Sequence, residues 1–99
     1  MSRIQMTEAA EEDLAAIRAY IRRDSKVNAI RFVKRLREAI RGIRRFPEAA
    51  SIVQPFNQPS LREIFVGNYR IIYRLRDDVS YVITVIHGAR LLPDSVGRQ

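Results

Sequence analysis

The chain has 99 residues, 46% hydrophobic and 29% charged, which is typical of one globular domain and excludes a disordered chain. It contains no cysteine, which excludes disulfides, thiolate metal sites and a cysteine nucleophile and fits a cytoplasmic location. Neither a signal-peptide core nor an apolar run of roughly 20 residues is present, so we expect no membrane association. The net charge of +7 favours an acidic partner, either nucleic acid or an acidic protein segment.

Residues 1–6 are predicted to hold a short strand, at Arg3–Met6, and residues 7–46 a helical hairpin. Thr7 is a good N-cap residue, and the acidic side chains that follow it stabilise the positive end of a helix dipole. Apolar residues then recur at spacings of three and four, which predicts a helix over 8–23. The apolar residues of this stripe are Ala10, Leu14, Ile17 and Ile21.

A second helix is predicted over 26–45, after a break at Asp24-Ser25 that can cap it. Phe46-Pro47 should end this helix, because proline disfavours a helical residue before it. Gly42 lies inside the helix, where a close backbone approach is one explanation for a glycine. The predicted apolar stripe consists of Ile30, Val33, Leu36, Ile40 and Ile43.

Positive charge is concentrated in the hairpin, where residues 18–45 contain eleven basic and two acidic side chains. Sixteen of the eighteen basic residues of the chain are arginine, whose forked guanidinium suits carboxylate and phosphate groups. Two interpretations stay open at this point: a solvated helical face, or a surface for an acidic partner.

Residues 47–60 hold three of the four prolines and no periodicity, which predicts an irregular connection. Residues 61–90 predict three strands joined by tight turns at Gly67-Asn68 and Asp77-Asp78, and residues 91–99 form a short tail. The predicted fold class is therefore α+β, with an N-terminal helical hairpin packed on a small antiparallel sheet in the order β-α-α-β-β-β.

Two-residue turns at these positions pair Phe65 with Arg70 and Glu63 with Ile72. They also pair Ile72 with Ile83, and Arg70 with Val85. The face predicted to lie under the helices consists of Ile64, Val66, Tyr69, Ile71, Tyr73, Leu75, Val82, Thr84 and Ile86. The opposite face mixes apolar and charged residues: Leu61, Glu63, Phe65, Arg70, Ile72, Arg74, Tyr81, Ile83 and Val85.

Arginines on the opposite face allow two interpretations. Glu63 is diagonal to both Arg70 and Arg74, so the three side chains are expected to form a cross-strand ion-pair cluster. Alternatively, this face is a concave surface where Arg70 meets an anionic ligand. His87 and Arg90 follow the last strand, and His87 is a candidate general acid or base only if a second catalytic group faces it.

No serine–histidine–aspartate set, metal-binding HExxH motif, glycine-rich phosphate loop or carboxylate pair is present, so we predict no cofactor and no metal. The residues taken alone indicate a basic α+β binding module.

Several segments together resemble the ParE/RelE superfamily of bacterial type II toxins, from about Ile4 to Pro93. In the helices these are EAAEEDL with Ile17 and Tyr20-Ile21, and Phe32-Val33 through Phe46-Pro47. In the strands they are Leu61-Arg62-Glu63, GNYRIIY at 67–73 and VIHGAR at 85–90. The ordered set is more specific than any one segment.

The resemblance implies a cognate antitoxin, whose acidic C-terminal segment wraps around the toxin and neutralises it. The basic side chains of the hairpin and sheet would suit such a segment. The candidate antitoxin-binding residues are Arg31, Arg35, Arg41, Arg45, Arg62 and Arg74.

Two activities compete within the superfamily. RelE-like members cut mRNA on the ribosome, and the candidate catalytic residues here would be Arg70, Arg90, His87 and Arg62. The strand lysines and C-terminal tyrosine of that set are missing, since no lysine follows Lys34. We therefore predict a ParE-like, non-enzymatic inhibitor of DNA gyrase, with the mRNA endonuclease and a non-toxic basic binding module as alternatives.

Overall fold

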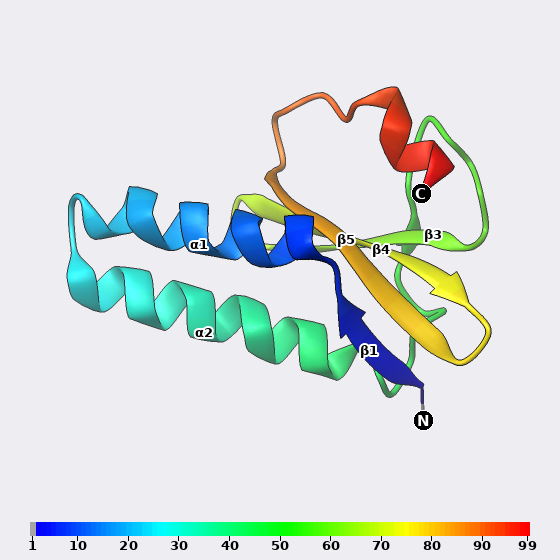
Figure 1. Cartoon of the computed structure of the whole chain (residues 1–99), viewed down its shortest axis with the longest axis horizontal. Helices are drawn as coiled ribbons and strands as arrows, with labels where there is room; N and C mark the ends of the chain where they lie inside the picture. Colours follow the sequence, from blue (N-terminus) through cyan, green and yellow to red (C-terminus); the bar gives the residue numbers. More distant parts are fainter. Residues whose placement is uncertain (1) are drawn as a thin grey trace.

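The computed structural model describes residues 2–99 and places a two-helix hairpin against a five-stranded sheet (Figure 1). The elements are β1 (Arg3–Met6), α1 (Glu8–Arg22), α2 (Lys26–Gly42), β2 (Ser51–Ile52), β3 (Leu61–Val66), β4 (Tyr69–Arg76), β5 (Val79–His87) and a 3-10 helix, η1 (Asp94–Arg98). Met1, within the predicted strand region 1–6, lies outside the described residues. Neither helix of the hairpin, nor η1, is long and apolar enough to cross a bilayer.

The predicted caps begin both helices. The Thr7 hydroxyl accepts a hydrogen bond from the Ala10 amide at 3.1 Å, and Ser25 does the same for the Asn28 amide. Helix α2 ends at Gly42, three residues earlier than predicted. Its core stripe begins at Ala29, so the prediction that Ile30 lies in the core is wrong: the side chain is 66% exposed.

The sheet has the order β1-β5-β4-β3-β2, and β1 runs parallel to β5. The sheet is therefore mixed rather than purely antiparallel, because the hairpin and β2–β4 together form the long crossover that a parallel neighbour requires. Strand β2 lies within the predicted irregular connection and pairs with β3 at the sheet edge. Two residues are too few to give a periodic signal.

Both predicted turns form. Gly67 and Asp77 each have a φ of +57°, the left-handed conformation that such turns require. The predicted partners of strands β3 and β4 are confirmed: Phe65 lies opposite Arg70, and Glu63 lies opposite Ile72.

A register shift in β5 contradicts the other predicted pairs. Ile72 lies opposite Thr84 and Arg70 opposite Ile86, while Tyr73 still pairs with Val82. Ile83 is thus an extra residue, a β-bulge, which exchanges the faces of the residues that follow. Val85 packs in the core under the helices, and Ile86 packs on the opposite face, where the regular alternation had predicted the reverse.

Helix α1 binds the backbone groups that the bulge removes from regular pairing. The Thr7 hydroxyl lies 2.8 Å from the Val82 carbonyl oxygen and 3.1 Å from that of Ile83. One carboxylate oxygen of Asp13 accepts hydrogen bonds from the Thr84 hydroxyl at 2.6 Å and from the Val85 amide at 3.0 Å. These contacts fix the position of α1 on the sheet.

Two apolar cores lie on the two faces of the sheet. The larger joins both helices to the sheet through residues such as Leu14, Leu36 and Ile71. The smaller covers the opposite face with the connection and the tail, and includes Leu61 and Val96. The predicted tail is therefore an ordered layer over the sheet, visible as the red segment of Figure 1.

Replacing Asp13 by Ala should lower the free energy of unfolding by about 1 to 3 kcal/mol, because the Val85 amide and the Thr84 hydroxyl lose their acceptor. Urea unfolding followed by circular dichroism measures this. Glu12→Ala, one residue earlier and exposed, is the matched control. Equal losses for the two variants would contradict the role assigned to Asp13.

Candidate functional site

The Arg62 guanidinium binds the connection that precedes β3 through two of its three nitrogens. Its Nε donates to the Pro59 carbonyl at 2.6 Å, and its Nη1 donates to the carbonyls of Ala50 at 2.9 Å and Glu48 at 2.5 Å. This arginine holds an otherwise irregular segment against the sheet. Its donors are directed at the protein's own backbone.

Arg74 is 8% exposed and joins the connection to the tail. Its Nη1 donates to the Gln58 amide oxygen and the Ser60 hydroxyl, each at 2.7 Å. Its Nε and Nη2 donate to the carbonyls of Gln99 at 2.6 Å and Gly97 at 3.2 Å. Burial, and secondly the charge of Arg76, lower the pKa of Arg74, although a guanidinium stays charged at neutral pH.

Glu63 pairs with only one of its two predicted partners. Its carboxylate lies 3.1 Å from Arg70 Nη1, and the two side chains are 12% and 11% exposed. Arg70 Nη2 donates to the Arg90 carbonyl at 2.9 Å. Among residues 2–99 Glu63 forms no ion pair with Arg74, so the predicted three-residue cluster is reduced to a pair.

Arg90 lies in the turn after β5, whereas His87 is the last residue of that strand rather than following it as predicted; both are exposed. The Ala89 amide donates to His87 Nδ1 at 3.2 Å, so the neutral ring carries its proton on Nε2. Arg70 contacts the main chain of Arg90, and its guanidinium does not line the shallow pocket that contains Arg90 and His87. Arg90 and His87 thus share a pocket, Arg70 contacts the same turn from outside that pocket, and Arg62 is bound to the connection.

Two tyrosines that were not predicted as site residues, Tyr20 and Tyr69, line the same pocket. The rings of Tyr69 and His87 meet edge to face, with centroids 5.4 Å apart. This contact could not be predicted, because the regular register pairs Arg70 with Val85, whereas the bulge in β5 places His87 opposite Tyr69. Within residues 2–99 no three histidine, aspartate or glutamate side chains gather as a metal site requires.

An apolar groove of about 220 Å³ lies between the end of α2 and β3. Phe46 at its rim is 73% exposed, whereas Ile43 and Tyr73 at its floor are buried. The Tyr73 hydroxyl donates to the Pro47 carbonyl at 2.7 Å, and burial raises its pKa, so it remains a donor at neutral pH. The groove residues are Ala39, Gly42, Ile43, Phe46, Ala49, Ala50, Ile64 and Tyr73.

Gly42 opens this groove rather than allowing a close backbone approach, because nothing lies within 4 Å of where a Cβ would stand. The small residues around it give the groove its depth. Arg41, Arg44 and Arg45, next to Gly42 in the sequence, are exposed. Of the predicted antitoxin-binding arginines, Arg31, Arg35, Arg41 and Arg45 are exposed, and none forms an ion pair within residues 2–99.

Solved structures share this fold. The chromosomal ParDE toxin–antitoxin system of P. aeruginosa matches with a TM-score of 0.73 over 88% of this chain and 96% of that chain, at 17% identity. The toxin RelE of E. coli, as a mutant in the free state, matches with a TM-score of 0.64 over 89% of this chain and 84% of that chain, also at 17% identity.

Sequence relationships identify the family. The toxin RelE2 of Caulobacter vibrioides is 33% identical over 92 residues, which cover 92% of this chain and all of that protein. Residues 4–92 match the family described as ParE toxin of the type II toxin–antitoxin system parDE. The chain belongs to this family of type II toxins, within the ParE/RelE superfamily.

Proposed function

We propose that this chain is a cytoplasmic toxin that inhibits DNA gyrase by binding it, rather than an enzyme that cuts RNA. The observation that carries this proposal is the engagement of the sheet arginines. Arg62 donates to three backbone carbonyls, and the two terminal nitrogens of Arg70 donate to Glu63 and to the Arg90 carbonyl, while the buried Nε of Arg70 has no partner. Both guanidinium groups are thus held by the protein itself.

The chemical groups that RNA cleavage requires also favour gyrase binding over RNA cleavage as the activity of this chain. RNA cleavage needs a base for the 2′-hydroxyl, an acid for the leaving oxygen and cations for the developing charge. Arginine, with a pKa above about 12, is a poor proton shuttle. The pocket that contains His87 holds a single cation, Arg90. Its other titratable side chains are Tyr20, Tyr69 and Asp13, and the Asp13 carboxylate is engaged by Thr84 and Val85.

The cognate antitoxin, in this proposal, fills the groove beside α2. An amphipathic acidic segment would place apolar side chains between Phe46 and Ile64, and its carboxylates near Arg35, Arg41 and Arg45. Arg31, next to Ile30, lies nearer the start of α2. Arg62 and Arg74 are less suited to this role than the sequence suggested, because hydrogen bonds within the protein engage them. Recognition therefore rests on α2.

The purified chain should inhibit gyrase supercoiling and leave mRNA on ribosomes intact. The variant Arg90→Ala tests the endonuclease alternative; it should change the free energy of unfolding by less than about 0.5 kcal/mol, since the side chain is exposed. A supercoiling assay and a primer-extension assay on translated mRNA measure the two activities side by side. Ribosome-dependent mRNA cleavage that Arg90→Ala abolishes would establish the endonuclease alternative instead.

Gly42 offers a matched pair of variants for the groove. Gly42→Ala should raise the free energy of unfolding by about 0.5 to 1 kcal/mol, because alanine favours a helix and the space is open. It should leave antitoxin binding intact. Gly42→Trp should fill the groove, so that co-expressed cognate antitoxin no longer restores growth.

Growth assays with and without the antitoxin, together with thermal unfolding of both variants, test this assignment. If antitoxin neutralised the tryptophan variant as well as the alanine variant, the groove would not be its binding site.

A further inference from the structure

The hairpin tip, where α1 passes into α2, projects beyond the sheet (Figure 1). Val27 and Ile30 on α2 are 55% and 66% exposed. Their spacing of three residues places them on one face of the helix, away from the buried stripe of Leu36 and Ile40. Two large aliphatic side chains side by side on a solvated helix are not explained by packing.

One charge at the tip is also unfavourable for the stability of helix α2. Helix α1 has Glu8 and Glu11 in its first turn, whereas α2 has no acidic residue there and begins with Lys26. A cation at the positive end of a helix dipole is unfavourable. Arg22 and Arg23 lie at the other end of α1, where cations are favourable, so Lys26 is the unexplained charge.

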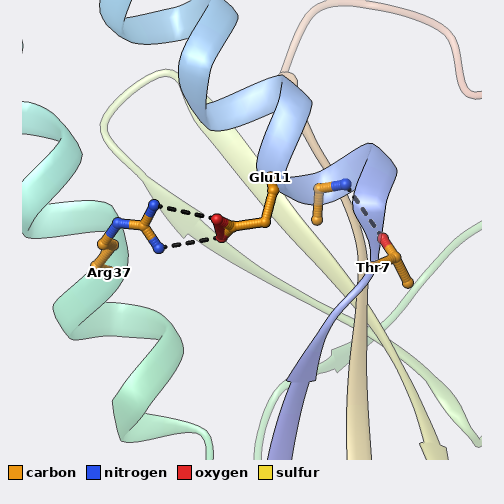
Figure 2. A network of polar contacts seen from close by, with 4 residues as sticks. Thr7, Glu11 and Arg37 are labelled. Carbon is orange, nitrogen blue, oxygen red and sulfur yellow. Dashed lines mark hydrogen bonds and ion pairs between the residues drawn. The ribbon is translucent and has the colours of Figure 1, made fainter.

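The hairpin is held together without these residues. Glu11 and Arg37 form an ion pair across the two helices at 3.1 Å, nearer the sheet (Figure 2). At the tip the buried residue of α2 is Ala29, which is 1% exposed. Lys26, Val27 and Ile30 are therefore free to contact another molecule.

The surroundings of the tip indicate the chemistry of that molecule. Residues 18–34 contain one acidic side chain, Asp24, and six basic ones: Arg18, Arg22, Arg23, Lys26, Arg31 and Lys34. None of these six cations forms an ion pair within residues 2–99, which favours an acidic partner. Val27 and Ile30 would find no apolar contacts on a phosphate backbone, so a protein surface fits better than nucleic acid.

We propose that the hairpin tip docks on an acidic protein surface that also presents apolar side chains, and that this surface belongs to the toxin's target. The inference rests on the proposed function, that the chain acts by binding. Ile30 and Gly42 are twelve residues apart on α2, about 18 Å along the helix axis, so the tip and the groove are separate surfaces.

Two tip variants test the proposal. Lys26→Glu should raise the thermal midpoint, because it places a carboxylate at the start of α2, and should weaken binding to purified gyrase at least tenfold. Val27→Ser/Ile30→Ser should weaken binding to a similar degree. The matched controls are Arg98→Glu, with the same charge change, and Leu91→Ser, at a residue that is 95% exposed.

Binding of each variant is measured by biolayer interferometry with gyrase and by fluorescence anisotropy with a labelled DNA duplex, and growth arrest is measured on induction in E. coli. Both tip variants should lose gyrase binding and growth arrest, with the controls unchanged. Gyrase binding and growth arrest at wild-type levels in the tip variants would overturn the proposal. So would a loss confined to Lys26→Glu and matched by its loss of duplex binding, which would indicate a phosphate-binding patch.

Failure of the gyrase assignment would look different, because wild-type protein would then not bind gyrase at all. In that case the growth assay tests the tip proposal. If both tip variants no longer arrest growth, the tip docks on another target; if both still arrest growth, the proposal that the tip binds the target is overturned.

Discussion

Arginine side chains that are buried or partly buried need acceptors, and the acceptors of Arg62, Arg70 and Arg74 organise the irregular parts of this protein. Arg62 binds three carbonyls of the connection, and Arg74 joins the connection to the tail. Arg70 bridges Glu63 and the turn after β5. Sequence segments without periodicity are thereby fixed on the second face of the sheet. The same hydrogen bonds engage Arg62 and Arg70, two of the three arginines that a nuclease would use for charge stabilisation, whereas Arg90 stays exposed.

Local signals in the sequence were sufficient for both helices and for β1, β3, β4 and β5, and insufficient for β2, η1 and the long-range pairing. Thr7 and Ser25 as caps, and Gly67 in its turn, act within a few residues, so their roles could be predicted. The β5 bulge could not, because the contacts that accommodate it come from Asp13, some seventy residues earlier. The parallel pairing of β1 and the depth of the groove likewise depend on distant segments.

The candidate site divides in the same way. The arginines could be identified as candidate binding residues from the sequence. Which of them have hydrogen-bond partners within the protein could not, because the acceptors are main-chain carbonyls of residues such as Ala50 and Gly97. What remains exposed is the basic face of α2, with the apolar groove at one end and the hairpin tip at the other. A toxin that acts by binding needs such surfaces more than it needs a proton shuttle.

If the sheet arginines stabilise the fold and take no part in catalysis, the double variant Glu63→Leu/Arg70→Met tests this role most directly. Replacing a buried ion pair by apolar side chains of similar volume is often neutral for stability, whereas removing one partner leaves a buried charge unpaired. Growth inhibition by this variant should be measured at matched expression, beside its urea unfolding curve. The account predicts inhibition equal to wild type in a stably folded variant; loss of inhibition with an unchanged free energy of unfolding would contradict it.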